Sequence, residues 1–431
     1  MKEWKSHYEQ IKVTPDEAVS AITSGKRVFM ETNCSEPLSL INALMRAKDR
    51  LEDIEMVQGF YRDKSCPYAQ HGMNKHFRIT SFHASEAIGK ALKEGWADYI
   101  PVHLYDIPRL CTEGPLPIDV AVVQLSPPDD EGYCSFGITV NFTKPIAESA
   151  KILIAEINDQ MPRTRGDTLI HITKVKFAVE HSHPLIELKK TEIDKVSEEI
   201  ASHAVDLIPD GATLQVGIGA IPNAILHFLK DRKDLGIHTG TISDTMAELL
   251  ARGVITNGRK EIDRGKAVTT MAMGTNQGVY RFVHGNPQVE FYPVSYTHDP
   301  FIVGKLERFV TINSAIQVDL HGQVNADTIK GRPVSGVGGA QNFIWGAWRS
   351  KGGKSIVALP STAAGGKISR IVPRLEAGAG VTTPRTDIHY VITEFGVADL
   401  MGKTLSQRAK ALIALAHPDF RQELKASLER R

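Results

Sequence analysis

Residues 214–223 read LQVGIGAIPN. The apolar start of this stretch predicts a buried strand, and Gly217 and Gly219 then predict a tight turn. Pro222 fits the first turn of a helix, where its missing N–H removes no hydrogen bond. A strand that passes through a glycine turn into a helix is the repeating unit of proteins built on parallel sheets. The stretch therefore predicts an α/β fold.

Short apolar runs alternate with amphipathic stretches on both sides of this segment. The runs that predict strands are 27–30, 54–58, 97–101, 119–126, 151–157, 213–219, 267–272, 289–294, 309–313, 355–360 and 389–395. Helices are predicted from about Ser39, over 84–95 and over 192–208, and Gly95 is placed to end the second of them.

A polar stretch at 180–195 separates two halves, because charge rises there and the strand and helix signals lapse. We therefore expect two lobes, residues 1–190 and 191–431. Each is expected to be an open, mainly parallel sheet flanked by helices.

The composition excludes several classes of protein. The 431 residues include 51 basic and 50 acidic side chains, so no net field favours nucleic acid or a membrane surface. No run approaches the roughly 18 apolar residues of a membrane span. The four cysteines are widely spaced and the N-terminus lacks a signal-peptide pattern, so we expect reduced thiols and a cytoplasmic protein.

The turn at Gly217–Gly219 could carry chemistry. Glycines between a strand and a helix let backbone N–H groups face a ligand, and the helix N-terminus adds partial positive charge. Such a turn can stabilise the oxyanion that forms when a thioester carbonyl is attacked. On spacing alone a simple tight turn is the better interpretation. Pro222 stands where a dinucleotide fingerprint needs its third glycine, so nicotinamide binding is not expected.

A second glycine-rich segment, SGVGGAQNFIWGA at 335–347, is followed by SKGGKS at 350–355. The exposed backbone at Ser335, Gly336, Gly338 and Gly339 would let a planar or phosphate-bearing ligand lie close. Lys351 and Lys354 could then meet pyrophosphate oxygens. An ordinary glycine loop with two solvated lysines is the competing interpretation, and the spacing excludes a Walker A motif.

Other candidates receive structural interpretations. His181 and His183 lie in the polar linker without further ligands at metal-site spacing, so a solvated loop and no metal site are predicted. Cys134 is interpreted as a small buried residue rather than a nucleophile. Trp345 and Trp348, three apart on a helical stretch, are expected to pack.

Residues 235–257, LGIHTGTISDTMAELLARGVITN, resemble the active-site segment of the acetyl-CoA hydrolase / 4-hydroxybutyrate CoA-transferase family of class I CoA-transferases. Further similarity lies at 124–137, 161–167, 214–223, 317–327, 335–355, 390–400 and 413–420. The resemblance implies two lobes of the class I CoA-transferase fold. It also implies coenzyme A as substrate and product, an acyl-CoA and a small carboxylic acid as partners, and a homodimer or other homo-oligomer.

The family's catalytic glutamate position is Gly240 in this chain, and Thr241 and Thr245 also depart from the usual pattern. In the family the glutamate becomes the covalent carrier of the acyl group and then of CoA, and Gly240 has no side chain to acylate. If transfer persists, another carboxylate must serve, and Asp244, Glu248 and Glu394 are the candidates in that order. For Glu394 a structural partner role is favoured over a catalytic one.

Three functions remain open from the sequence. The chain could be an acyl-CoA:carboxylate CoA-transferase with altered chemistry, and this is the leading hypothesis. It could be an acyl-CoA hydrolase or lyase in which the oxyanion turn polarises the thioester and water or an internal group attacks. It could also be a non-catalytic CoA-binding homologue or partner subunit. The Gly217–Gly219 turn would stabilise the oxyanion and the Ser335–Gly339 loop would bind CoA in both of the enzymatic hypotheses.

Overall fold

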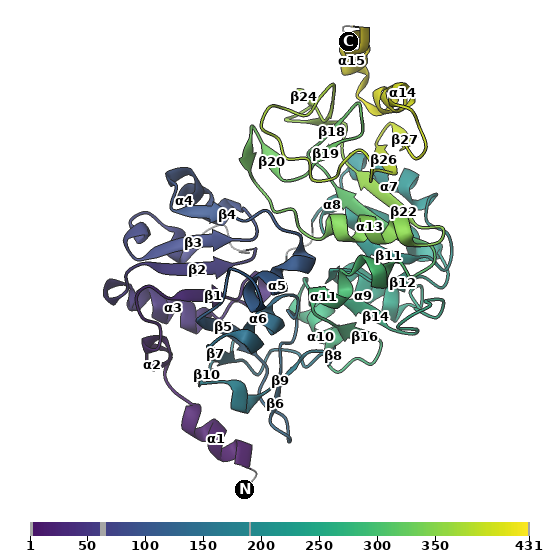
Figure 1. Cartoon of the computed structure of the whole chain (residues 1–431). Coiled ribbons are helices and arrows are strands. Elements are labelled where there is room, and N and C mark those ends of the chain that lie inside the picture. The colour runs from purple at the N-terminus through teal and green to yellow at the C-terminus, as the bar shows by residue number, and fades with distance from the viewer. Residues whose placement is uncertain (1–2, 61–65, 189–190, 430–431) are drawn as a thin grey trace. The chain divides into compact units, whose positions relative to one another are not determined.

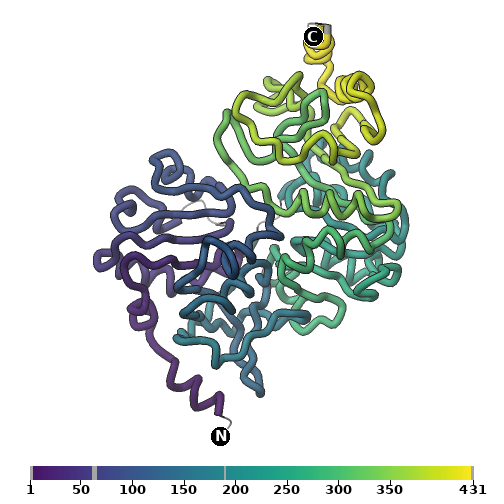
Figure 2. The backbone as a smooth tube through the Cα atoms, in the orientation of Figure 1, coloured from purple at the N-terminus to yellow at the C-terminus, as the bar shows by residue number. Residues whose placement is uncertain are grey.

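The computed structural model describes residues 3–60, 66–188 and 191–429. The chain forms two compact units (Figures 1 and 2). The first contains Met1–Lys189 and Thr269–Tyr296, and the second contains Lys190–Val268 and Thr297–Arg431. The expected boundary at residue 190 falls on a position outside the described residues. A single cut there does not describe the units, because residues 269–296 belong to the first.

The first unit is built on a seven-stranded sheet with the order β10-β7-β5-β1-β2-β3-β4, in which every neighbouring pair is parallel. Its strands are β1 (Arg27–Met30), β2 (Ile54–Gln58), β3 (Phe77–Ser81), β4 (Ala97–Tyr99), β5 (Val120–Leu125), β7 (Ile152–Ile157) and β10 (Phe177–Glu180). The inner strand β5 is buried at every residue, which explains its continuous apolar run.

Helices precede β1 and connect the later strands. They are α1 (Glu3–Ile11), α2 (Pro15–Ser20), α3 (Leu38–Arg46), α4 (Gly89–Glu94), α5 (Ile107–Thr112) and α6 (Thr143–Ser149). The predicted end of the 84–95 helix is confirmed: Gly95 closes α4 with φ 80°, a left-handed conformation that glycine adopts without strain.

Segment 269–296 is fastened to the first unit by its backbone. Asn141 N–H donates to the Thr270 carbonyl at 3.2 Å, and Val294 N–H donates to the Asn141 carbonyl at 3.0 Å. Strand β16 (Val289–Phe291) pairs with β8 (Arg165–Gly166). A Cβ on Gly166, which has φ +98°, would lie 2.4 Å from the Phe291 carbonyl oxygen, so this pairing requires glycine.

The second unit contains a six-stranded sheet with the order β12-β11-β17-β22-β26-β27. These strands are β11 (Thr213–Val216), β12 (Gly236–Ile237), β17 (Phe309–Ser314), β22 (Lys354–Ala358), β26 (Tyr390–Thr393) and β27 (Gly396–Asp399). All neighbours are parallel except β26 and β27, which form an antiparallel edge. The expectation of two mainly parallel α/β lobes is therefore confirmed.

The helices of the second unit complete the connections between its strands. They include α7 (Lys195–Val205), α8 (Ala220–Phe228), α9 (Asp244–Ala251), α12 (Pro300–Val303), α13 (Ala340–Arg349), α14 (Leu405–Leu415) and α15 (Pro418–Glu429). The helix predicted over 192–208 is shorter at both ends. It begins after Asp194, because the Asp194 carboxylate accepts from Ser197 N–H and caps α7 there.

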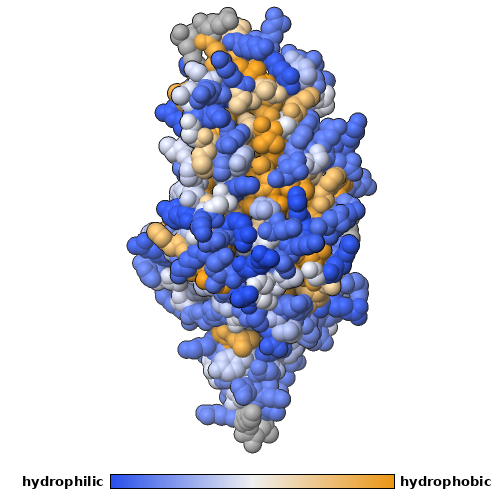
Figure 3. All heavy atoms as spheres, turned by 90° about the vertical axis from the view of Figure 1, so that its right-hand side faces the viewer, coloured by the Kyte–Doolittle hydropathy of each residue, from blue (hydrophilic) through white to orange (hydrophobic). Residues whose placement is uncertain are grey.

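The surface in Figure 3 is mostly polar, with apolar side chains gathered between the polar ones. None of the helices in the described parts of the chain is long and apolar enough to cross a membrane. All four cysteines are buried thiols, as expected for Cys134. Burial raises the pKa of the Cys134 thiol to about 12, so it is not ionised at neutral pH and is a poor nucleophile.

Candidate active site

The predicted oxyanion turn and the Gly240 segment lie at the same edge of the second sheet. Strands β11 and β12 are parallel neighbours, with Leu214 paired with Ile237. His238 N–H donates to the Leu214 carbonyl at 3.0 Å, and the Thr239 hydroxyl donates to the Val216 carbonyl at 3.3 Å. Because both strands end at this edge, Gly217–Gly219 and Gly240 follow them on adjacent paths.

The turn itself has the backbone that an anion site needs. Gly219 adopts φ 123° and ψ −175°, a region open almost only to glycine, and is the N-cap residue of α8. The first N–H groups of α8 have no partner within the helix, so they are available to a ligand. A Cβ on Gly217, by contrast, would meet its nearest atoms at 3.9 Å, which is ordinary contact. Gly219 is therefore the residue that fixes the turn.

An imidazole faces the vacant side-chain position of Gly240. A Cβ built on Gly240 would lie 3.1 Å from Nε2 of His298 and 3.8 Å from Cε2 of Phe343. His298 is buried, its ring centre lies 4.5 Å from that of Phe343, and its Nδ1 lies 2.9 Å from the Thr297 hydroxyl. The side-chain position of Gly240 is thus bordered by a nitrogen base.

Both imidazoles in this region are neutral at physiological pH. Burial lowers the pKa of His298 to about 3. Burial and the nearby Lys260 ammonium lower the pKa of His238 to about 3, and His238 Nε2 lies 2.9 Å from the Thr297 carbonyl oxygen. A tautomer of His238 with hydrogen on Nε2 therefore holds the backbone beside His298.

Two glycines allow the close helix packing that places His298 against Phe343. A Cβ on Gly346 of α13 would lie 2.3 Å from Val303 Cγ1 of α12. A Cβ on Gly304, just after α12, would lie 2.7 Å from the Arg349 Cβ. Since α12 begins two residues after His298, this crossing fixes the imidazole relative to α13.

The Ser335–Gly339 loop reaches the same region because it leads directly into α13, whose first turns carry Phe343. Ser335 N–H donates to the Asp327 carbonyl at 3.2 Å. Gly338 has φ +65° with no side chain within ordinary contact of its Cβ position, and Gly339 is the N-cap residue of α13. Phe343, which borders the Cβ position of Gly240, therefore lies four residues after this loop.

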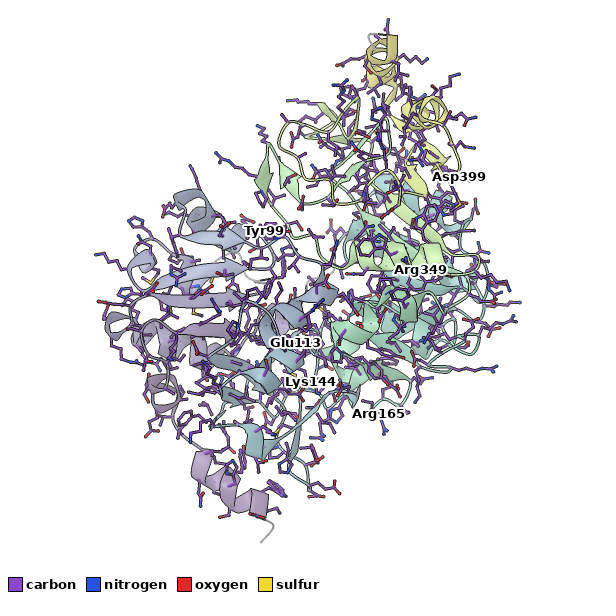
Figure 4. All side chains as sticks on the ribbon, in the orientation of Figure 1. Tyr99, Glu113, Lys144, Arg165, Arg349 and Asp399 are labelled. Carbon is purple, nitrogen blue, oxygen red and sulfur yellow. The ribbon has the colours of Figure 1, made fainter. Side chains whose placement is uncertain are left out.

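Lys351 and Lys354 do not join that loop. They follow the opposite end of α13, a ten-residue helix that spans roughly 15 Å. Its last residue, Arg349, is labelled in Figure 4. Lys351 is 83 % exposed and pairs with Glu307 at 3.1 Å, whereas the Lys354 ammonium donates to the Leu207 carbonyl at 2.8 Å.

The three alternative carboxylates have different surroundings. Asp244 is buried in the first turn of α9, directly after Ser243, whose hydroxyl caps that helix. Glu248 is exposed one turn later. Glu394 accepts hydrogen bonds from the Ser361 N–H at 2.8 Å and hydroxyl at 2.6 Å, which supports its structural interpretation.

The tryptophans and the polar linker are also located. The indole N–H groups of Trp345 and Trp348 both donate to Asp387, at 2.7 Å to its carboxylate and 2.6 Å to its carbonyl. Trp345 is partly buried, as a packing role requires, whereas Trp348 is 41 % exposed. The interpretation of the linker as a solvated loop is wrong for His183, whose side chain is only 12 % exposed.

Known proteins resemble this chain along its full length. The model of the acetyl-CoA hydrolase/transferase N-terminal domain matches residues 1–188, and that of the C-terminal domain matches 274–428. A 4-hydroxybutyrate coenzyme A transferase of Clostridium kluyveri is 48 % identical over 429 residues, covering 100 % of both chains. The chain belongs to the acetyl-CoA hydrolase/transferase family. Gly240 and the oxyanion turn lie between the two matched ranges, so the matches do not test these positions.

Other known proteins are also similar to this family member along its full length. A succinyl-CoA:cyclohexane-1-carboxylate CoA transferase of Geobacter metallireducens is 38 % identical, covering 100 % of this chain and 97 % of its own. The crystal structure of RipA from Yersinia pestis has a TM-score of 0.94 at 37 % identity, with 99 % of both chains covered. That of a 4-hydroxybutyrate CoA-transferase from Porphyromonas gingivalis has a TM-score of 0.86 at 37 % identity, with full coverage of both.

Sequence reasoning missed His298. No motif marks the segment, and its contact with Gly240 joins residues far apart in the chain. The available signal was indirect: Asp299 and Pro300 form a helix start, and Asp299 does cap Phe301 N–H at 2.7 Å. That signal places His298 just before a helix, but it does not show which residue the imidazole ring contacts.

Proposed function

We propose that this protein hydrolyses acyl-CoA thioesters, with water attacking in place of the family's glutamate carrier. The observation that supports this proposal is the pair formed by Gly240 and His298. Position 240 offers no carboxylate, and the imidazole Nε2 lies 3.1 Å from where its Cβ would stand. A neutral imidazole in that place can activate water, whereas it cannot form the anhydride that transfer requires.

The thioester carbonyl oxygen is proposed to sit at the Gly217–Gly219 turn, against the N-terminus of α8. Water attacks the carbonyl carbon and gives a proton to His298 Nε2, and the C–S bond then breaks. The CoA thiolate leaves with that proton, so a free acid and CoA result. This assignment needs hydrogen on Nδ1 of His298, donated to the Thr297 hydroxyl 2.9 Å away. The low pKa makes Nε2 a weak base, so the proposal relies on its position.

Coenzyme A is proposed to lie along the Ser335, Gly336, Gly338 and Gly339 backbone and the N-terminus of α13, where phosphate is favoured. Lys351 and Lys354 are not included, since they follow the other end of that helix. Gly338→Leu should abolish CoA binding by calorimetry, because it fills the loop and strains φ +65°. Lys354→Gln is the comparison and should bind normally. Normal CoA binding by a folded Gly338→Leu variant would show that this loop is not the CoA-binding site.

CoA transfer to a second carboxylic acid is the alternative, because Asp244 is a buried carboxylate only four residues beyond Gly240. The names of the relatives also favour transfer in those proteins. In this case Asp244 would become the covalent carrier, and Asp244→Asn would abolish activity.

One experiment separates these functions. The protein is incubated with acetyl-, butyryl-, succinyl- and 4-hydroxybutyryl-CoA, each with and without acetate, and the CoA products are separated by chromatography. Hydrolysis predicts free CoA in both arms, with no new acyl-CoA. Transfer predicts a new acyl-CoA only when a different acid is present. A non-catalytic CoA-binding protein gives neither, and that result would remove the proposal.

A further inference from the structure

A second buried polar cluster lies in the first unit, at the carboxyl ends of β7 and β10. Glu156 is near the end of β7, and His181 and His183 follow β10 directly. The two strands are parallel neighbours, with Glu180 paired with Ile157. The register therefore brings both imidazoles to the edge of the sheet where Glu156 ends its strand.

The three side chains are close enough to share an ion. His183 Nε2 lies 2.9 Å from Glu156 Oε1, and His181 Nδ1 lies 3.6 Å from Oε2. One ligand atom from each residue falls within 4.8 Å of the others. Glu156 is fully buried, whereas the His181 side chain is 41 % exposed, so the cluster is closed on one side and open to solvent on the other.

The hydrogen bonds around the cluster accommodate a positive charge beside His183, either a second proton on its ring or a metal ion. His183 Nδ1 lies 3.0 Å from the Pro184 carbonyl oxygen, which can only accept, so the hydrogen is on Nδ1. In the neutral ring Nε2 then turns a lone pair toward the Glu156 oxygen. These two acceptors repel each other unless a proton or a metal ion lies with them. His181 Nδ1 is also buried and makes no hydrogen bond among the described residues.

Glu156 is held in place by α3. The Ser39 N–H, at the start of that helix, donates to Glu156 Oε2 at 2.7 Å, and the Ser39 hydroxyl donates to the same oxygen. A helix N-terminus stabilises a negative charge. The cluster therefore presents one carboxylate charge to the two imidazoles.

The loop that carries the imidazoles is fixed by Asn158. Its side-chain N–H donates to the His183 carbonyl at 2.8 Å, and its oxygen accepts from the His183 N–H at 3.3 Å. A ligand residue whose backbone is held in place loses less entropy on binding.

We propose that Glu156, His181 and His183 bind one divalent transition-metal ion, with zinc as the best match and solvent completing its coordination. Two nitrogens and one carboxylate oxygen are the ligands that zinc takes at about 2.0–2.2 Å, whereas magnesium and calcium prefer oxygen alone. Ligands at that radius in a tetrahedron are roughly 3.3 Å apart, so Nε2 and Oε1, which lie 2.9 Å apart, would separate by a few tenths of an ångström on binding.

The ion would have a structural role, fastening the segment after β10 to β7 and α3. The sequence prediction of no metal site considered only His181 and His183 in their own segment. The third ligand comes from a neighbouring strand, and spacing within one segment cannot show it.

The test uses untagged full-length protein freed of metal by a chelator and then dialysed. Co²⁺ is added and its visible absorption is followed, and Zn²⁺ is added in competition. We expect one Co²⁺ per chain, displacement by Zn²⁺, and a higher Tm with Zn²⁺ present. His181→Gln, at a partly exposed position, and His183→Gln should each weaken binding by about tenfold or more. His71→Gln, which changes an exposed imidazole of the same unit, should leave binding unchanged.

Absence of a Co²⁺ spectrum and of a Tm shift with Zn²⁺ would overturn the proposal and assign a proton to the His183–Glu156 contact. Equal binding by parent, His181→Gln and His183→Gln would also overturn it. Thioester turnover plays no part in these measurements, so they are independent of the proposed hydrolysis.

Discussion

His298 is the residue on which the proposed chemistry depends. We expect His298→Asn to reduce acyl-CoA hydrolysis by about a hundredfold or more, the scale of losing a general base. Asparagine keeps a polar group at this buried position, and we expect it to retain the fold. Steady-state release of CoA measures the effect, with His227→Asn, on α8 of the same unit, as the control. An unchanged kcat in the His298 variant would exclude this role.

The effect of restoring the family's carboxylate at position 240 should depend on which residue is present at position 298. We expect Gly240→Glu alone to give a destabilised protein without transfer, because the new Cβ would crowd Nε2 at 3.1 Å. The double change Gly240→Glu with His298→Gly removes that ring and should create acyl-CoA:acetate transfer. The products are acetyl-CoA and the free acid, and the covalent intermediate is a glutamyl-CoA thioester sensitive to borohydride. Transfer by the single variant would show that the imidazole is not the obstacle.

The two buried imidazoles should make the free energy of unfolding decrease as the pH falls. Burial lowers the pKa of His238 and of His298 to about 3, below the ordinary value of about 6.5. The unfolded chain therefore binds protons between these values that the folded chain does not. Stability from each group is complete above pH 6.5 and is lost as pH falls toward 3. By about pH 4 the loss is on the order of 3 kcal/mol per imidazole.

Urea unfolding at neutral pH and near pH 4 checks this expectation. His298→Gln, which does not titrate, should lose less of its unfolding free energy over that range than the parent. If both proteins lose the same amount, His298 is charged or solvated in the folded state.

At the scale of elements, the strand-to-helix turn after β11 offers a matched pair of glycines. Gly219→Ala imposes φ 123° on a residue with a Cβ, which should distort the N-terminus of α8 and lower turnover by about a hundredfold, as expected for loss of an oxyanion donor. Gly217→Ala has ordinary contacts and should stay near the parent rate. Turnover with several acyl-CoAs and circular dichroism distinguish a lost donor from a lost fold. The opposite order of activities would assign the oxyanion to another group.

The elements with continuous apolar runs could be predicted from the sequence. Residues 27–30 and 54–58 coincide with β1 and β2, because buried parallel strands need apolar side chains on both faces. Strand β3 was missed, since its FRITS sequence alternates polar and apolar residues over only five positions. The candidate site also has a part that the sequence could predict and a part that it could not. Gly240 could be located from a linear motif, whereas the position of His298 depends on how α12 crosses α13.

At the scale of the whole molecule, the returning segment 269–296 determines which fragments can fold. We expect a fragment of residues 1–189 to be unstable, because Asn141 and Gly166 lose the backbone partners that segment supplies. A fragment in which 269–296 is joined to residue 189 by a flexible linker should unfold at a higher temperature. Circular dichroism and proteolysis compare the two. Equal stability would show that the segment only lies on the unit without supporting it.

The order in which this chain is synthesised follows from the same segment. The ribosome completes residues 1–189 first, but the piece that closes the first unit is made only after Lys190–Val268 has emerged. At about 5–20 residues per second the open unit waits for roughly 5–20 s before Tyr296 appears. During that interval the groups later covered by residues 269–296 are exposed to chaperones and to neighbouring nascent chains. A pause in translation just before residue 269 would prolong this exposure, so synonymous codons there could influence the yield of folded protein.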